Sequence, residues 1–378
     1  MRSLLAVCAV VILIAACKKD KEIPSEEQEV RYELVLPEEP FDYAYLGLPD
    51  HVANNTQLNV YAANNEPSGN PITNEGATLG RVLFYDRALS VDNTMSCASC
   101  HQQAFAFTDP RQFSIGVHGD VTRRNSMSLL NMRYFRDFFW DMSADGLEAQ
   151  VLMPIVDPTE MDQDLESLLV ELSETEHYPA LFEAAFGDPE ITTDRISRAM
   201  AQFIRSIVSF DTKFDDGVPT NFANFNEQET LGKDLFYSGE FGCNQCHNSY
   251  NFFTRLEPAN NGLETMTVDS GYYVNTGNPD HIGMFKIVSL RNVEVTGPYM
   301  HDGRFATLEE VMDHYSDNLQ AHPNLDERLT TGTENGDPPL QMNLTDEEKQ
   351  AMIAFMKTLT DHAVMQDLKF SDPFVVLE

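Results

Sequence analysis

The sequence is poor in basic residues: 25 Lys and Arg stand against 60 Asp and Glu among 378 residues, which gives a formal net charge of −35. Charge of this sign repels phosphate backbones and anionic lipid surfaces, so the composition argues against nucleic-acid binding, and a partner steered by charge would be basic. Apolar residues make up 42 % of the chain, which is enough for packed cores and excludes a disordered acidic chain. The length predicts two domains.

The N-terminus is apolar but too short to span a bilayer. Residues 3–16 carry no charge and fit the apolar core of a secretory signal peptide. Residues 14–17 resemble a bacterial lipobox, in which Cys17 becomes the lipid-bearing first residue of the mature protein; the alternative is an ordinary signal peptide with an accidental cysteine. We therefore predict a signal peptide at 1–16, a lipid-anchored tether at 17–45, and a periplasmic or outer-membrane-associated lipoprotein.

Cysteine is scarce, and outside the N-terminal region it occurs in two CxxCH motifs, at 97–101 and 243–247. CxxCH is the attachment signature of c-type haem: the two thiols add to the vinyl groups, and the histidine supplies an axial nitrogen. The motifs are too far apart for a zinc ribbon, and neither a redox pair nor a disulfide framework needs a histidine after each second cysteine. We predict two covalent haem c groups. Their attachment residues are Cys97, Cys100, His101, Cys243, Cys246 and His247.

The pattern around the two motifs is repeated. LGRVLFY at 79–85 precedes the first motif and LGKDLFY at 231–237 precedes the second, and apolar residues at helical spacing predict a closing helix in each half, at 191–209 and 344–360. No alternating run is long enough for a substantial sheet. The sequence therefore predicts an all-α protein of two tandem cytochrome c-type haem domains with a haem-bridging interface. The predicted domains are residues 46–214 and 215–366, followed by a C-terminal tail at 367–378.

Several runs beyond the haem motifs carry a family resemblance. They are RRN at 123–125, LLN at 129–131, FWD at 139–141, Gln150, PTEM at 158–161, LRNV at 290–293 and PYMHDG at 298–303. With these runs the chain resembles the bacterial di-haem cytochrome c peroxidase family, which includes the MauG-type enzymes that mature methylamine dehydrogenase. The resemblance implies that haem one binds hydrogen peroxide and that haem two passes electrons to it.

Peroxide cleavage needs a base that takes a proton from one oxygen and delivers it to the other. Glu160 follows the apolar run 151–156, so burial and a raised pKa are expected. On the residues alone, the alternative is one more acidic residue capping a helix. The resemblance implies that Glu160 is the distal acid-base residue, Gln150 the distal amide and Trp140 the indole between the haems.

The sixth ligands of the irons would decide the subclass. His118 lies one residue further from His101 than the family's gating histidine, so it is a candidate ligand of haem one; the alternative is an exposed loop histidine. Tyr315 stands where the peroxidases proper have a methionine ligand of haem two, and MauG-type members have tyrosine there. Tyr315 is therefore the candidate ligand of haem two, with Met300 and Met312 as alternatives.

The resemblance also implies a calcium site between the domains. Asn125 would give a side-chain oxygen, and Thr296 and Pro298 would give backbone carbonyls, which are ligands that this hard cation accepts together with water.

The sequence thus predicts a di-haem peroxidase that reduces hydrogen peroxide to water with electrons from a small redox protein, either a cytochrome c or a cupredoxin. A MauG-like high-valent haem oxidase that acts on a partner protein or an organic substrate is the first alternative, and Tyr315 favours it. The second is a non-enzymatic electron-transfer cytochrome, which gives no account of Glu160 and Gln150. Whether the protein is a monomer or a homodimer stays open.

Overall fold

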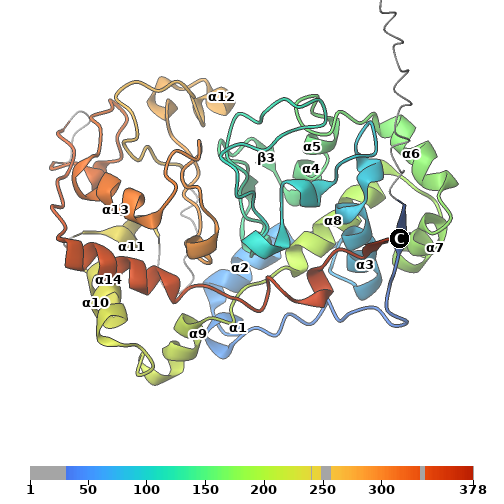
Figure 1. The fold of residues 1–378 in the computed structure, drawn as a ribbon, viewed down its shortest axis with the longest axis horizontal. Helices are drawn as coiled ribbons and strands as arrows, with labels where there is room; N and C mark the ends of the chain where they lie inside the picture. The colour runs from blue at the N-terminus through green and yellow to red at the C-terminus, as the bar shows by residue number, and fades with distance from the viewer. Residues whose placement is uncertain (1–30, 240, 248–256, 333–336, 378) are drawn as a thin grey trace, which may run out of the picture.

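The computed structural model of the chain describes residues 31–239, 241–247, 257–332 and 337–377. The chain folds into two lobes of helices and loops that lie side by side (Figure 1). The predicted signal peptide at 1–16 and Cys17 lie outside the described residues. Within the described ranges, no helix combines the length and the apolar character needed to cross a membrane.

The first lobe contains most of the helices and two short strand pairs. Its helices are α1 (Asp50–Ala53), α2 (Thr56–Asn65), α3 (Asn74–Tyr85), α4 (Leu147–Gln150), α5 (Met153–Val156), α6 (Leu165–Glu174), α7 (Tyr178–Phe186) and α8 (Thr193–Ser206). The strands are β1 (Tyr32–Leu34), which pairs with β4 (Phe374–Val376), and β2 (Asp137–Phe138), which pairs with β3 (Ala144–Asp145); both pairs are antiparallel.

The second lobe follows a short linking helix, α9 (Lys213–Gly217). Its helices are α10 (Glu227–Phe236), α11 (Cys243–Cys246), α12 (Tyr273–Thr276), α13 (Leu308–Asp317) and α14 (Asp346–Lys357). Because the described strands are only two or three residues long and pair only in twos, the predicted all-α fold is confirmed.

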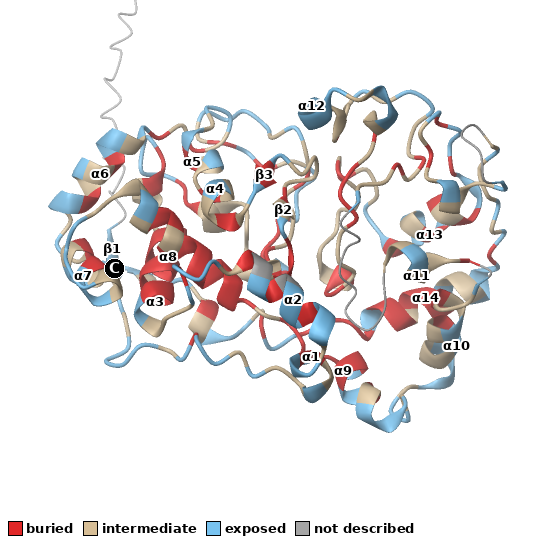
Figure 2. Ribbon diagram, turned by 180° about the vertical axis from the view of Figure 1, so that it is seen from behind, coloured by how far each residue is buried: buried red, intermediate tan, exposed pale blue. Residues whose placement is uncertain are grey.

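Each lobe is built on one crossed helix pair, α3 with α8 and α10 with α14, and Figure 2 shows buried residues concentrated on α3, α8 and α14. The glycine of the repeated Leu-Gly pair lies where the two helices of each pair meet: Gly80 between α3 and α8, and Gly232 between α10 and α14. A side chain at Gly80 would place its Cβ 2.0 Å from the carbonyl oxygen of Ala199, and one at Gly232 would lie 1.9 Å from that of Ala351. The repeat seen in the sequence is therefore a packing requirement of the two crossings.

Both ends of the described chain pack on the first lobe. Tyr43 is fully buried in its core, and Phe370, which follows the second lobe in sequence, is buried there as well. The Tyr85 hydroxyl donates a hydrogen bond of 2.6 Å to the Phe370 carbonyl. Parts of the predicted tether at 17–45 and tail at 367–378 that the structure describes, among them Leu34, Tyr43, Phe370 and Phe374, pack on the first-lobe core, while the predicted domain bounds stay predictions. Long-range pairing of this kind leaves no local pattern in the sequence.

Ion pairs hold the two lobes together. Asp215, on α9, accepts hydrogen bonds of 2.8 Å from both terminal nitrogens of Arg291 in the second lobe, and it lies 2.9 Å from His51 Nε2 on α1. Arg124 of the first lobe donates from Nε to Asp269 of the second lobe at 2.7 Å. These contacts fix the relative placement of the lobes, on which any site between them depends.

Candidate functional site

The first lobe contains a cavity around the first CxxCH motif that is partly open to solvent and has about 520 Å³ of empty space. It is lined by Phe84, Met95, Ser96, Cys97, Cys100, His101, Leu129, Gln150, Val151, Pro154, Glu160, Met161, Met200 and Ile204. The structure therefore brings together the predicted attachment residues of haem one and two of the three predicted catalytic residues, Gln150 and Glu160.

The first motif forms a tight 3₁₀ turn over Cys97–Ser99, and the His101 amide closes it by donating to the Cys97 carbonyl at 2.9 Å. His101 Nδ1 lies 3.0 Å from the Phe107 carbonyl. Because a carbonyl only accepts, Nδ1 carries the hydrogen, and the lone pair of Nε2 is left for a metal. Burial lowers the pKa of His101, which favours this neutral ring.

Glu160 and Gln150 enter the cavity from the segment that follows β3. Gln150 is the last residue of α4, and Glu160 lies in a turn in which its amide donates to the Asp157 carbonyl at 3.0 Å. Burial, with a smaller contribution from the charge of Asp157, raises the pKa of Glu160 to about 7. A carboxyl group with this pKa can accept and release a proton near neutrality.

The helix α4 is itself held by an ion pair with a buried arginine. Arg205 on α8 is fully buried and donates to both carboxylate oxygens of Glu148, at 2.7 and 2.6 Å. Glu148 also accepts from Asn70 at 2.8 Å. These hydrogen bonds fix α4, and with it the position of Gln150; no spacing in the sequence indicated this pairing.

His118 lies outside the first cavity. Its side chain is 51 % exposed, and its Nε2 lies 2.7 Å from Asp162 Oδ2. The loop that carries it packs directly on the Glu160 turn: the Val117 amide donates to the Glu160 carbonyl at 2.7 Å. In this structure His118 is an exposed loop histidine, and its role as a gating ligand stays a prediction.

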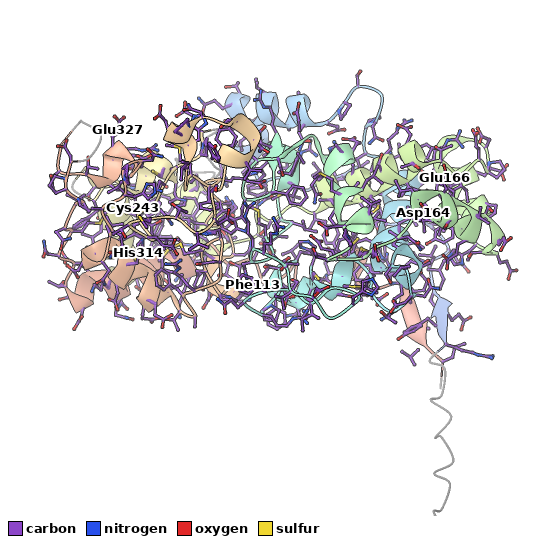
Figure 3. The ribbon with its side chains drawn as sticks, turned by 90° about the horizontal axis from the view of Figure 1, so that it is seen from above. Phe113, Asp164, Glu166, Cys243, His314 and Glu327 are labelled. Atoms are coloured by element: carbon purple, nitrogen blue, oxygen red, sulfur yellow. The ribbon has the colours of Figure 1, made fainter. Side chains whose placement is uncertain are left out.

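The second lobe contains a larger cavity around the second CxxCH motif, which is partly open to solvent and has about 1420 Å³ of empty space. Cys243, Cys246 and His247 line it together with Tyr315 and Trp140; Figure 3 marks the position of Cys243 in this lobe. The arrangement repeats that of the first motif. His247 Nδ1 lies 3.1 Å from the Val288 carbonyl, and burial lowers the pKa of His247 to about 4, which again leaves Nε2 of a neutral ring for a metal.

Three candidate sixth ligands share the second cavity: Tyr315 from α13, Met312 one turn earlier, and Met300. Burial raises the pKa of Tyr315 to about 12, although a hydrogen bond with Asn261 lowers it. Asn261 also donates to Met300 Sδ at 3.3 Å. Sequence reasoning missed Asn261, which no motif marks, and the choice among the three ligands stays a prediction.

Trp140 lies at the junction of the lobes. It lines the second cavity and a third, interlobe cavity of about 740 Å³, but it does not line the first. Its indole Nε1 donates to the Asn125 carbonyl at 2.9 Å, and its ring meets His301 edge to face at 6.4 Å. Trp140 therefore lies between the lobes, and its role as the indole between the haems stays a prediction.

The predicted calcium ligands Asn125, Thr296 and Pro298 all line the interlobe cavity. Asn125 donates its amide hydrogens to the carbonyls of Arg111 and Gln112, at 3.2 Å each. Among the described residues, no group of three His, Cys, Asp or Glu side chains is placed to hold a metal. The trio is thus gathered in space, while calcium binding stays a prediction.

The chain matches a known protein family over its first lobe. A model of the family described as di-haem cytochrome c peroxidase matches residues 74–221. The chain is 31 % identical over 300 residues to the methylamine utilization protein MauG of Methylorubrum extorquens, covering 78 % of this chain and 80 % of that protein. It is 33 % identical over 291 residues to the cytochrome c551 peroxidase of Nitrosomonas europaea, covering 75 % and 79 %.

Solved structures show the same fold. The crystal structure of a MauG-like protein associated with microbial copper homeostasis has a TM-score of 0.72 and 34 % identity, covering 81 % of this chain and 95 % of that one. The diheme peroxidase BthA from Burkholderia thailandensis has a TM-score of 0.65 at 24 % identity, with coverage of 79 % and 89 %.

Proposed function

We propose that this chain, which belongs to the bacterial di-haem cytochrome c peroxidase family, is an oxidoreductase that reduces hydrogen peroxide to water with electrons from a small redox protein. One observation carries the proposal: Glu160, Gln150 and the first CxxCH motif line the same cavity, and the buried carboxyl has a pKa of about 7.

Both cavities fit a covalently attached haem c. Cys97, Cys100 and Cys243 carry free thiols, and each motif's histidine keeps Nε2 available by pairing Nδ1 with a carbonyl. The residues that would hold the groups are Cys97, Cys100 and His101 in the first lobe and Cys243, Cys246 and His247 in the second. Haem c bound there supplies an iron that binds peroxide in the first cavity and an electron carrier in the second.

The chain's own contribution to the reaction is proton transfer and positioning. Glu160 takes the proton from one peroxide oxygen and delivers it to the oxygen that leaves as water. Gln150 contributes an amide to the same lining, which is mostly apolar and keeps the carboxyl desolvated. Trp140, at the junction of the lobes, is the side chain through which electrons pass from the second site to the first.

The test replaces Glu160 with Gln, which keeps the size of the side chain and removes its acid-base chemistry. Peroxide consumption with a reduced donor should fall about 100-fold or more while both haems stay attached. The control is Glu166→Gln, an exposed carboxyl at the start of α6 that is visible in Figure 3. Wild-type turnover in Glu160→Gln would contradict the assignment.

A second candidate function is oxidation of a partner protein or an organic substrate, favoured by Tyr315 in the second cavity and by the similarity to MauG. It requires the fully oxidised protein to react with peroxide, whereas the gated peroxidase reacts only after one haem is reduced. Optical spectra of both states after stoichiometric peroxide separate the two. If Tyr315 is the ligand, Tyr315→Phe changes the oxidised spectrum; an unchanged spectrum points to Met300 or Met312, or to an open coordination site.

The remaining proposals concern export, calcium and the anchor. Haem c is attached outside the cytoplasm, which supports a signal peptide at 1–16 and a periplasmic location, with lipid on Cys17. Membrane fractionation of Cys17→Ser, which should release the protein, checks the anchor. Asn125, Thr296 and Pro298 are proposed to bind calcium, and metal analysis before and after chelation checks this.

A further inference from the structure

Lys286 is a buried lysine at the junction of the lobes, beside the second cavity. It is 6 % exposed and lines both the second cavity and the interlobe cavity. Its backbone amide donates to the Trp140 carbonyl at 2.8 Å, so the residue is fixed next to the indole at the junction of the lobes. Burying a lysine this deeply costs free energy, because the ammonium group loses most of its solvation, unless a counter-charge compensates the loss.

In the described structure the ammonium group of Lys286 meets a backbone carbonyl and two aromatic rings. Its Nζ donates to the backbone carbonyl of Asp137 and faces the rings of Phe135 and Phe138, with 4.5 and 5.4 Å to their centroids. Among the described residues, no carboxylate oxygen lies within 4.0 Å of it. Burial lowers the pKa of Lys286 to about 7, because the loss of solvation outweighs the opposing effect of the charge of Asp137.

The other Lys and Arg side chains that line these two cavities are already paired. Arg291 has both terminal nitrogens on Asp215 at 2.8 Å, and Arg328 donates from Nε to Asp326 at 2.5 Å and also from its terminal nitrogen. No Lys or Arg lines the first cavity. Among the described residues around the three cavities, Lys286 is therefore the one Lys or Arg that still lacks a carboxylate partner.

We propose that Lys286 is a cofactor-binding residue whose ammonium group pairs with a propionate carboxylate of a haem. The inference rests on the proposed haem attachment and goes beyond it by naming the counter-charge. Haem c carries two propionates, which are costly to bury unless they are paired and hydrogen-bonded. The carboxylate belongs either to the haem of the second cavity or to the haem of the first, reaching into the interlobe cavity.

The test compares the haem-loaded Lys286→Met and Lys286→Arg variants with a matched control, Lys357→Met. Lys357 is half exposed, lies 3.6 Å from Glu294 and lines none of the three cavities. Resonance Raman spectra report the propionate bending mode, and potentiometric titration gives the potential of each haem. Lys286→Met should shift this mode and lower the potential of one haem, because loss of a nearby cation disfavours the added electron. Lys286→Arg keeps the positive charge, so the propionate mode and the haem potentials should stay close to those of the wild type.

Glu160→Gln identifies which haem responds. Glu160 lines only the first cavity, so the electron paramagnetic resonance signal that this variant perturbs belongs to haem one. If Lys286→Met shifts the reduction potential of the haem that gives this signal, the propionate belongs to haem one. If it shifts the reduction potential of the other haem, the propionate belongs to haem two.

Unchanged modes and potentials in Lys286→Met, relative to Lys357→Met, would overturn the inference. If Lys286→Met does not fold, Lys286→Gln takes its place, since it keeps a donor but not the charge. Haem content is measured first, because wild-type protein without two covalent haems would refute the proposed function, whereas two haems with no response at Lys286 would refute only this inference.

Discussion

At the scale of the residue, Glu160 combines two properties that are rarely found together: it is desolvated, and no basic side chain compensates its charge. The cavity that it lines contains no Lys or Arg, and the nearby Asp157 only adds negative charge. Desolvation and the charge of Asp157 both raise the pKa of Glu160. The result is a carboxyl group that is close to half protonated at neutral pH, as the proposed proton transfer requires.

The reaction should therefore depend on pH through Glu160. The base must be ionised to accept a proton, and its pKa is about 7, so kcat/KM should rise through neutrality and fall about tenfold per pH unit below it. A pH profile of peroxide reduction measures this. The Glu166→Gln control should keep the same profile. A flat profile across the acidic range would show that Glu160 does not titrate in the rate-determining proton transfer.

The site residues differ in how well the sequence predicted them. The CxxCH motifs predicted both cavities because covalent attachment demands a fixed spacing of residue types. The apolar run at 151–156 indicated the burial of Glu160, but the roles of Glu160 and Gln150 came from the resemblance, since burial alone does not assign a function to one of 60 acidic residues. Asn261 and Lys286 were missed because their surroundings come from segments far away in the chain.

At the scale of the element, the loop that carries His118 is coupled to the turn that carries Glu160. A side chain at Gly116 would place its Cβ 2.0 Å from the Thr159 carbonyl oxygen and 2.9 Å from that of Glu160. The adjacent amide of Val117 donates to the Glu160 carbonyl. Movement of this loop would thus be transmitted to the acid-base residue, whether or not His118 ever binds iron.

Gly116→Ala should disturb this contact. The added methyl group cannot fit against backbone atoms, so the loop or the Glu160 turn must shift, at a cost of about 1–3 kcal/mol in unfolding free energy. We expect a lower midpoint of thermal unfolding and a kcat reduced about tenfold or more, because small displacements of catalytic groups are costly. Gly69→Ala is the control, since nothing lies within 4 Å of its added Cβ. Equal kcat values in the two variants would rule out the coupling.

The helices show what periodicity can and cannot predict. The two closing helices were predicted at 191–209 and 344–360, and they form as α8 (Thr193–Ser206) and α14 (Asp346–Lys357). Threonine caps start both: Thr192 accepts from an amide in the first turn of α8, and Thr345 forms a capping box with Glu348. Their C-terminal ends are shorter than predicted, because apolar residues continue beyond the helix into the packed connection.

At the scale of the whole molecule, the two lobes act as one unit because both ends of the chain return to the first lobe. β4 pairs with β1, and Phe370 packs in the first core after the chain has passed through the second lobe. The arrangement fixes the interlobe cavity, in which Trp140, Asn125 and Lys286 meet. A division into domains by sequence position alone could not anticipate this closure.

The net charge of −35 also acts on the whole molecule. It favours encounter with a basic donor protein over an acidic one, and the preference should weaken as salt screens the field.

The measurement that most directly tests the account is the stoichiometry of donor oxidation. A reduced, basic cytochrome c is mixed with limiting peroxide and haem-loaded protein, and its oxidation is followed optically. The account predicts two donor molecules oxidised per peroxide by the wild type and by Glu166→Gln. It predicts almost none within the same time by Glu160→Gln, although that variant keeps both haems. Peroxide loss without donor oxidation, or full donor oxidation by Glu160→Gln, would contradict it.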